Sequence, residues 1–352
     1  MSNKKSFTVV ILPGEGIGPE VIAHAMTILQ AVLELENLNI VFKEGLIGQK
    51  ALDATGFGLP IDTLNMCKNA DAILFGAVSK HGLLELRSGC NFFANLRPVK
   101  IWPELLDCST LKSDTIAETD ILFVRELVGG LYFGPSGVEE NNGNPYAYHT
   151  MQYYDYQIRQ IAQVAFEQAQ KRSGSIVLAH KENALPKIRW CSLVAELATE
   201  YPNIVVQPML VDTVAMELVR EPKQFDTILS GNMFGDILSD IGAGITGSIG
   251  LLPSASLNGN GQGMYEAIHG TAPQLVGKNR VNPTATIMSV AMLLGNWGYN
   301  RAATRIEQAV RTAINDGFRT ADIATNNNFV SSSVFTEAIV ERLPAISSLE
   351  TA

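Results

Sequence analysis

Residues 7–21, FTVVILPGEGIGPEV, decide the fold class of this chain. A β-branched apolar run over 7–12 predicts a buried strand, and the glycine-rich turn after it leads into a helix that Pro19 can start. A strand, a tight turn and a helix form the repeating unit of α/β proteins. The glycines, at 14, 16 and 18, do not match the G-x-G-x-x-G fingerprint of Rossmann folds, and no acidic residue ends a suitable second strand about 20 residues on. The stretch therefore favours a structural turn in an α/β fold over a Rossmann dinucleotide site.

The same alternation continues along the chain and predicts a largely parallel sheet. Five more short apolar runs predict strands: DAILFGAV (71–78), DILFV (120–124), SIVLAH (175–180), NIVVQPML (203–210) and FDTILSG (225–231). Two segments between the runs, 19–36 and 157–170, carry apolar residues at helical spacing. The stripes are Ile22, Ala25, Leu29, Val32 and Leu33 in the first, and Ile158, Ile161, Ala165 and Ala169 in the second.

Composition narrows the class of protein. The 352 residues are 46% hydrophobic and 17% charged, which is typical of a globular protein with room for two domains. A net charge of −9 argues against nucleic acid as a partner, since that needs a basic face. No apolar run reaches the roughly 18 residues of a membrane span. The four scattered cysteines, with no CxxC pair, fit a cytoplasmic protein better than a disulfide framework or a zinc site.

One long polar segment interrupts the pattern. Residues 134–150, GPSGVEENNGNPYAYHT, are rich in Gly, Asn and Pro, and predict either a surface hairpin or an arm that touches a partner subunit. The region of Pro98 and the stretch GSIGLLPSAS near residue 250 are the places where a second domain could be inserted.

Three arginines lie in apolar surroundings: Arg87 in GLLELRSG, Arg97 in FFANLRPVK and Arg125 in DILFVRELVGG. A buried guanidinium keeps its proton and needs an anionic partner. For any one of them a structural salt bridge, such as Arg125 with Glu126 or Glu85, explains the residue. Three together, each near a glycine or proline bend, favour a pocket for a polyanionic ligand.

Three carboxylates are candidate metal ligands, and one lysine is a candidate base. In SGNMFGDILSD (230–240), Asp236 and Asp240 are four residues apart, so both can face one Mg²⁺ or Mn²⁺ ion or simply face solvent, and Asp212 is a third carboxylate. Lys181 and Asn183 follow a predicted strand, at the edge where α/β proteins bind ligands. Lys181 is either a base or a solvated loop lysine. Tyr132 by itself suggests packing.

These motifs together resemble the isocitrate/isopropylmalate dehydrogenase family of β-hydroxyacid oxidative decarboxylases over nearly the whole chain. The matching pieces, in the family's order, are GEGIGPEV, LDATGFGLP, LLELR with FFANLRP, VRELVGGLYFG, GNMFGDILSD, GLLPSAS and HGTAPQLVGKNRVNPTA. The run RELVGGLYFG is similar to the isopropylmalate branch, since the isocitrate branch carries an Asn-Thr-Glu run there.

The resemblance implies an open mixed sheet in two domains that is not a Rossmann fold. Residues 1–95 and 249–352 would form the cofactor-side domain, and 96–248 an inserted dimerisation and metal/substrate domain with the arm at about 134–150. It also implies a homodimer with shared active sites, in which Asp212 and Lys181 reach in from the partner subunit.

The resemblance further implies a role for each site residue. Lys181 and Tyr132 would be catalytic, and Asp212, Asp236 and Asp240 would bind the Mg or Mn ion. The substrate-binding set would be Arg87, Arg97, Arg125, Leu83 and Leu84. The NAD-binding set would be Asn183, Glu266, His269, Gly270, Thr271, Ala272, Gln274 and Asn282.

The activity it implies is NAD-dependent, metal-dependent oxidative decarboxylation of 3-isopropylmalate to 2-oxo-4-methylpentanoate, a step of leucine biosynthesis. Two alternatives stay open: the same chemistry on another 3-substituted malate, such as homoisocitrate or tartrate, and a non-catalytic regulatory paralogue. Two departures from the family's pattern motivate them. The loop GAVSKHGLLELR is shortened, with Lys80 in the place of an acid, and Gln274 replaces the usual aspartate that contacts the adenosine ribose.

Overall fold

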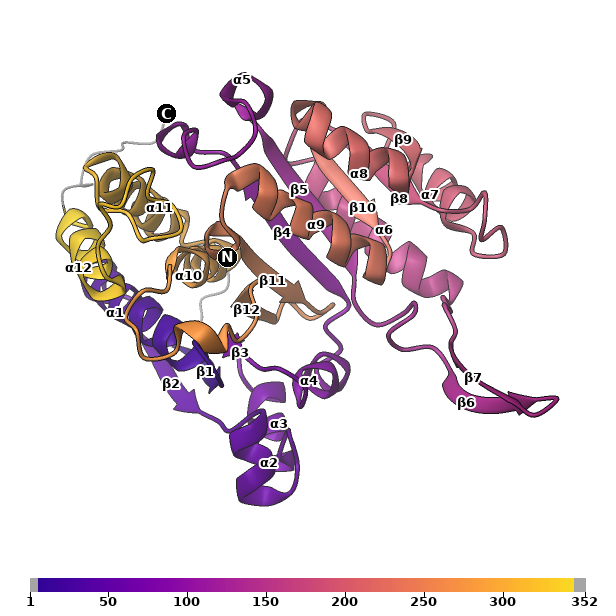
Figure 1. Ribbon diagram of the computed structural model, residues 1–352, viewed down its shortest axis with the longest axis horizontal. Coiled ribbons are helices and arrows are strands. Elements are labelled where there is room, and N and C mark those ends of the chain that lie inside the picture. The colour runs from indigo at the N-terminus through magenta and orange to yellow at the C-terminus, as the bar shows by residue number, and fades with distance from the viewer. Residues whose placement is uncertain (1–5, 345–352) are drawn as a thin grey trace.

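The computed structural model describes residues 6–344, which fold around a ten-stranded mixed sheet with helices on both of its faces (Figure 1). This confirms the predicted α/β class and the open mixed sheet. The strand order is β2-β1-β3-β12-β11-β4-β5-β10-β8-β9. The strands are β1 (Phe7–Gly14), β2 (Ile40–Glu44), β3 (Ala72–Ala77), β4 (Ala94–Lys100), β5 (Asp120–Glu126), β8 (Ser175–His180), β9 (Val205–Leu210), β10 (Thr227–Ser230), β11 (Pro253–Leu257) and β12 (Gly263–Ala267).

The helices follow the predicted alternation with the strands. They are α1 (Gly18–Glu36), α2 (Gln49–Thr55), α3 (Ile61–Lys68), α4 (Leu83–Gly89), α5 (Ser113–Ile116), α6 (Asp155–Ala169), α7 (Trp190–Ala198), α8 (Val211–Arg220), α9 (Asn232–Thr246), α10 (Thr284–Asn296), α11 (Asn300–Asn315) and α12 (Ser332–Arg342). Four short 3₁₀ segments lie between them, at Pro103–Leu105, Pro222–Gln224, Ile249–Leu251 and Pro273–Leu275.

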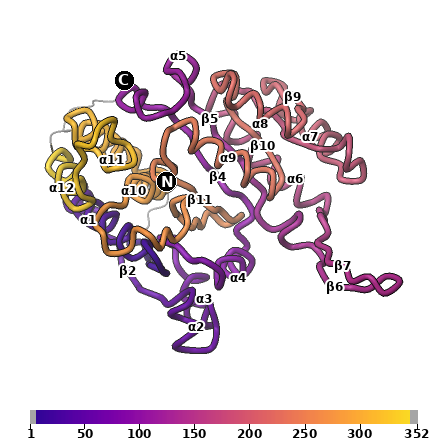
Figure 2. The backbone as a smooth tube through the Cα atoms, in the orientation of Figure 1, coloured from indigo at the N-terminus to yellow at the C-terminus, as the bar shows by residue number. Residues whose placement is uncertain are grey.

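Both predicted helical stripes are buried, which explains where these helices lie. The stripe of α1 packs with α10, α11 and α12 against one face of β1, β3 and β12. The stripe of α6 packs with α7 against β5, β8 and β10 in the other half of the sheet. Figure 2 shows these two groups of helices at opposite ends of the molecule.

The strands of the second half are apolar on both faces. In β5, Leu122 and Val124 contact the α6–α7 layer, while Ile121 and Phe123 contact the α8–α9 layer. Successive side chains of a strand point to opposite faces, so a strand covered by helices on both sides has no polar position to offer until it ends. Polar residues of β5 therefore lie only at its ends, with Asp120 at the amino end and Arg125 and Glu126 at the carboxyl end.

The centre of the sheet is antiparallel, which the strand pattern alone did not predict. Strand β4 pairs antiparallel with both β5 and β11, and β11 pairs antiparallel with β12, whereas all other pairs in the sheet are parallel. Six of the nine strand pairs are parallel, so the predicted largely parallel sheet is confirmed, and only the three central pairs depart from it. Strands β11 and β4 lie side by side in the middle of the sheet. Their pairing joins the half that contains β1, β3 and β12 to the half that contains β5, β8 and β10.

The polar segment at 134–150 forms a hairpin of β6 (Ser136–Asn141) and β7 (Asn144–His149) that projects away from the sheet (Figure 1). Val138 on this hairpin is 77% exposed. No helix in residues 6–344 is long and apolar enough to cross a membrane.

Candidate active site

The three arginines line one cavity of about 230 Å³ at the middle of the sheet. Leu83, Leu84, Tyr132, Asp236, Glu266, His269 and Gly270 line it with them. Arg87, Arg97 and Arg125 are buried, with exposed fractions of 8%, 6% and 2%. The structure therefore confirms that residues from α4, β4 and β5, far apart in the sequence, come together as the arginine pattern predicts.

The antiparallel pairing of β4 and β5 sets the arginines in register. Asn95 in β4 lies opposite Arg125 in β5, and Arg97 follows two residues later. The amide oxygen of Asn95 accepts a hydrogen bond from Arg97 Nε at 2.7 Å, and its amide nitrogen donates to the Ser254 hydroxyl at 2.7 Å. Asn95, which sequence reasoning missed, thus fixes the direction of the Arg97 guanidinium by tying it to β11.

Helix α9 lies against Arg125 because residue 235 is a glycine. A Cβ at Gly235 would come within 2.9 Å of the Arg125 side chain. The side-chain oxygen of Asn232, in the first turn of α9, accepts from Arg125 Nε at 3.2 Å and from Nη2 at 2.8 Å. Its amide nitrogen donates to the Gly129 carbonyl at 3.1 Å. Asn232 was also missed, although the motif GNMFGD contains it.

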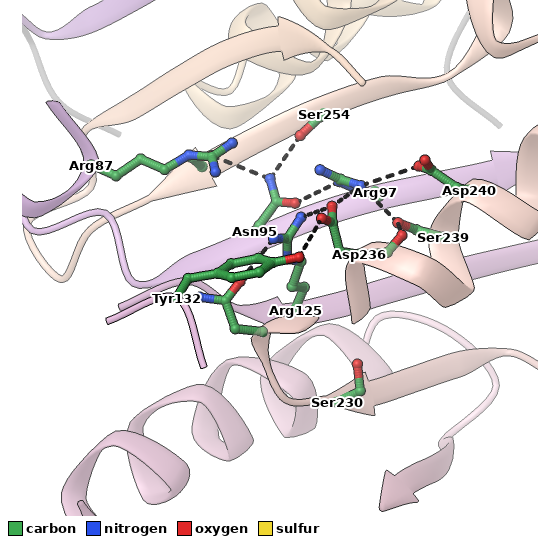
Figure 3. Close-up of polar contacts among 12 residues, drawn as sticks. Arg87, Asn95, Arg97, Arg125, Tyr132, Ser230, Asp236, Ser239, Asp240 and Ser254 are labelled. Atoms are coloured by element: carbon green, nitrogen blue, oxygen red, sulfur yellow. Dashed lines mark hydrogen bonds and ion pairs between the residues drawn. The ribbon is translucent and has the colours of Figure 1, made fainter. Parts of the chain in front are cut away.

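Asp236 is the centre of the polar network, as Figure 3 shows. Its Oδ1 accepts from Arg97 Nη1 at 3.3 Å and from Arg125 Nη1, and its Oδ2 accepts from the Tyr132 hydroxyl at 3.1 Å. Arg125 therefore pairs with Asp236 and Asn232 rather than with Glu126 or Glu85, the salt bridges considered from the sequence. Glu85 instead accepts from the Gly82 N–H at the start of α4.

Asp236 and Asp240 fit a divalent metal ion in their chemistry and surroundings. They are one turn apart on α9, and Asp240 has only a 3.7 Å contact with Arg97 Nη1. Burial, together with the negative charge of Asp236, raises the pKa of the Asp240 carboxyl. A nearby cation would relieve this repulsion, and carboxylate oxygens are the ligands that Mg²⁺ and Mn²⁺ prefer.

Tyr132 is the most accessible of the polar groups in the cavity, at 42% exposed. Burial and the adjacent Asp236 carboxylate raise the pKa of its phenol. The hydroxyl therefore keeps its proton at neutral pH, and it lies where a bound ligand would meet it.

The cavity carries an excess of positive charge. Burial lowers the pKa of both Arg97 and Arg125, and the repulsion between these two guanidinium groups lowers the pKa of Arg125 further. Arg87 donates to Glu266 Oε1 at 3.0 Å, but its buried Nε has no hydrogen-bond partner among residues 6–344. An unsatisfied buried donor costs about 1–3 kcal/mol, so a bound anion would stabilise this arrangement.

Lys181 and Asp212 lie together but apart from this cavity within the chain. The ammonium of Lys181, just after β8, donates to Asp212 Oδ2 at 2.6 Å, in the first turn of α8. The hydrogen bond from Lys181 lowers the pKa of Asp212. Among residues 6–344, Asp212 does not join Asp236 and Asp240 in a single set of metal ligands. One chain thus supplies the predicted site in two separate parts.

The predicted cofactor loop borders the arginine cavity at His269 and Gly270. Burial lowers the pKa of His269, and its Nε2 is buried without a partner among the described residues. A side chain on Gly270 would meet open space. The unpaired His269 Nε2 can donate to or accept from a ligand, and the Gly270 backbone is open to one. Both features fit a cofactor bound along this loop.

The GEGIG turn supports this loop. The Ile17 N–H donates to the Thr271 carbonyl at 2.9 Å, and a Cβ at Gly16 would lie only 2.1 Å from that oxygen. Farther along the loop, Gln274 is exposed, whereas Asn282 is buried, with its side-chain oxygen accepting from the Thr284 N–H at the start of α10. The glycines of the turn are thus needed for the close approach of two backbones, in agreement with the structural reading of the sequence.

Glu126 is a buried carboxyl that sequence reasoning did not single out as a site residue. It is 1% exposed, and it accepts from the N–H groups of Val128 at 2.7 Å and Gly129 at 2.9 Å. Burial raises the pKa of Glu126 to about 7. Its carboxyl therefore shapes the turn between Arg125 and Tyr132.

We expect the Glu126→Gln variant to lose part of the pH dependence of stability. Because the pKa is raised in the folded state, the stability linked to this carboxyl is fully present below the unfolded pKa and is lost as pH rises through about 7. Between pH 5 and pH 8, the free energy of unfolding of the variant should gain up to about 3 kcal/mol relative to the parent chain. Urea unfolding at several pH values measures this. The exposed Glu140→Gln serves as control, and parallel curves for Glu126→Gln and the parent would contradict the assignment.

Taken together, the fold and cavity define a class of α/β protein with a buried arginine cavity next to two carboxylates on one helix and to the loop at His269 and Gly270. Residues 8–339 match the model of the isocitrate/isopropylmalate dehydrogenase family, and the chain belongs to that family.

Similar proteins of known name agree with this assignment. The chain is 49% identical to the chloroplastic 3-isopropylmalate dehydrogenase of Brassica napus, over 91% of this chain and 83% of that protein. It is 48% identical to 3-isopropylmalate dehydrogenase of Hahella chejuensis, over 95% of this chain and 98% of that protein. Its fold superposes on isocitrate dehydrogenase from Methylococcus capsulatus with a TM-score of 0.86, at 30% identity over 96% of this chain and 99% of that one.

These comparisons confirm the family that the motifs suggested and make the chain a dehydrogenase of the decarboxylating type. In general the family depends on a nicotinamide cofactor and a divalent metal ion.

Proposed function

We propose that this chain catalyses the NAD-dependent oxidative decarboxylation of 3-isopropylmalate to 2-oxo-4-methylpentanoate, the leucine-biosynthetic step. The observation that carries the proposal is the single cavity in which Arg87, Arg97 and Arg125 face Tyr132, Asp236 and two leucines. Three guanidinium groups suit a substrate with two carboxylates, and the leucines suit its alkyl branch.

The chain's residues divide the reaction between them. Bound NAD⁺ would accept a hydride, while a divalent ion would polarise the substrate's hydroxyl and carboxylate oxygens. Arg87, Arg97 and Arg125 orient the two carboxylates, and the spare Nε of Arg87 is available for one of them. Lys181, in its neutral amine form, accepts the proton of the 2-hydroxyl, and Asp212 pairs with the ammonium that results. After CO₂ leaves, the neutral phenol of Tyr132 donates a proton to carbon 3.

The active site is shared between the subunits of a homodimer, with Lys181 and Asp212 reaching the Asp236 cavity of the partner. This proposal is supported by the separation of the two groups within one chain. The shared site goes with a division into two domains. Residues 1–95 and 249–352 form one domain, and residues 96–248 form the other, whose β6–β7 hairpin is the dimer arm. Two apolar clusters, one in each half of the sheet, support that division, although Trp102 and Leu105 join the first cluster and Phe93 and Ala94 the second.

Mixed dimers test the shared site. Chains carrying Lys181→Met and chains carrying Asp236→Asn should each be inactive, because each lacks one part of every site. After unfolding and refolding together in equal amounts, they should recover about a quarter of parental activity, since half of the dimers are mixed and each mixed dimer has one intact site. No recovery, with dimers confirmed by light scattering, would place both residues in the same chain's site.

A substrate panel tests the activity itself. With Mn²⁺ and NAD⁺, kcat/KM for 3-isopropylmalate should exceed that for malate, tartrate, isocitrate and homoisocitrate, because Leu83 and Leu84 offer an apolar surface to the branch. Faster turnover of another 3-substituted malate would transfer the proposal to that substrate, in line with the shortened loop at Lys80. Absence of turnover by the purified chain would favour the regulatory paralogue.

Cofactor preference depends on Gln274. This exposed side chain is neutral, so it neither pairs with the ribose hydroxyls as a carboxylate would nor repels a 2′-phosphate. Of the nearby cations, Lys278 is exposed and Arg280 lies 4.6 Å from the Phe329 ring. We expect NAD⁺ to be preferred, but less strongly than in relatives with aspartate.

The Gln274→Asp variant should raise the NAD⁺ over NADP⁺ ratio of kcat/KM by about tenfold, because the new carboxylate binds the ribose hydroxyls and repels the phosphate. Steady-state kinetics with both cofactors measures the ratio. As a control, Lys278→Gln should lower activity with NADP⁺ alone. If the parent chain already favoured NADP⁺ about tenfold, this interpretation of the loop would be wrong.

A further inference from the structure

Three side chains that the proposed reaction does not use gather where β8 meets α7. His180 is the last residue of β8, Cys191 is in the first turn of α7, and Glu182 lies in the loop between them. One ligand-capable atom of each lies within 4.8 Å of the other two. Within residues 6–344, no other set of three or more His, Cys, Asp or Glu side chains meets that distance.

The local hydrogen bonds hold this group together and separate it from Lys181. Glu182 Oε1 accepts from the Cys191 N–H at 2.6 Å, and the Glu182 N–H donates to His180 Nδ1 at 3.3 Å. Lys181, between the two, donates instead to Asp212 on α8. Neighbouring residues thus contact different helices: the side chains of His180 and Glu182 lie near the start of α7, whereas that of Lys181 contacts α8.

The three side chains have the chemistry of a zinc site. Imidazole nitrogen, thiolate and carboxylate oxygen are the protein ligands of Zn²⁺, whereas Mg²⁺ and Mn²⁺ favour oxygen alone. The three side chains are only partly buried, so an ion can reach them from solvent. A small, partly open space of about 10 Å³ borders His180 and Glu182 on one side.

We propose that His180, Glu182 and Cys191 form a second metal site, which binds zinc or a similar thiolate-seeking divalent ion and is distinct from the aspartate site. As the sulfur–metal bond forms, the Cys191 thiol gives its proton to solvent. The bound ion joins the end of β8 to the start of α7. It therefore restrains the loop 181–189 that carries Lys181 and Asn183.

Cobalt binding tests this site by a signal that depends on the thiolate. The full chain is titrated with Co²⁺ in excess Mg²⁺, so that the aspartates do not contribute. The expected result is one equivalent of Co²⁺ per chain with a thiolate-to-cobalt charge-transfer absorption, which Zn²⁺ then displaces. Cys191→Ser should remove the absorption, and His180→Asn should weaken Co²⁺ affinity about tenfold to a hundredfold or more.

The half-buried cysteine at Cys108 provides the matched control, since it lies near Arg319 and away from this group. Cys108→Ser should keep both the absorption and the affinity, and circular dichroism of each metal-free variant checks its fold. Absence of the absorption in the parent chain would overturn the proposal. So would an absorption that persists in Cys191→Ser or disappears in Cys108→Ser. If Cys191→Ser fails to fold, unchanged affinity in His180→Asn would overturn it equally.

Discussion

Replacement of Lys181 by methionine is expected to lower kcat by about three orders of magnitude while substrate affinity changes little. Methionine keeps the length and the apolar stem of the side chain but cannot accept a proton, and loss of a positioned general base costs about 10²–10⁴-fold in rate. The three arginines that bind the carboxylates are untouched, because Lys181 contacts none of them within the chain. Single-turnover formation of NADH measures the hydride step, and calorimetric titration measures substrate binding.

The loop itself supplies the control for this variant. Lys187 is exposed on the same loop, so Lys187→Met removes the same charge without touching the Lys181–Asp212 pair. It should retain parental kcat. A Lys181→Met chain that keeps kcat within about tenfold of the parent would remove Lys181 from the role of base.

Replacement of Asp236 by asparagine is expected to abolish turnover and to destabilise the metal-free protein as well. The charge of Asp236 compensates two buried guanidinium groups, those of Arg97 and Arg125. Removing one partner of a buried ion pair costs up to about 3–5 kcal/mol, and the retained amide oxygen and the part exposure of Asp236 reduce this to about 1–3 kcal/mol. Loss of a metal ligand accounts for the fall in kcat. Thermal unfolding without metal, and titration of free Mn²⁺ by its paramagnetic resonance signal, measure the two effects separately.

Asp240→Asn separates the two roles of these carboxylates. The Asp240 side chain is 58% exposed and has only the 3.7 Å contact with Arg97. Its substitution should weaken Mn²⁺ binding as Asp236→Asn does, yet leave metal-free stability within about 0.5 kcal/mol of the parent. Equal stability losses in both variants would contradict the special pairing of Asp236 with the arginines. Unaltered activity of both at limiting Mn²⁺ would show that α9 simply presents a solvated acidic face.

Local pattern in the sequence determined the elements of this fold. The run FTVVIL followed by a glycine-rich turn predicted β1 and α1, and helical spacing predicted which faces of α1 and α6 are buried. These features depend on backbone conformation and on the periodicity of side chains along a few turns, which neighbouring residues control. The same locality made Asp236 and Asp240 predictable as a pair, because four residues of helix place two side chains on one face.

Only the tertiary structure decided how the site is assembled. The antiparallel pairing of β4 with β11 sets Asn95 beside Ser254, and the close approach of α9 at Gly235 brings Asn232 and Asp236 to Arg125. Arg87 meets Glu266 across 179 residues of sequence. No local preference encodes these contacts, because each depends on two elements packing in a particular register and on which charges are buried together. For the same physical reason, local pattern could name Lys181 and Asp212 only as reactive groups. Their separation from Asp236 within one chain was implied by the family resemblance, and the fold shows it.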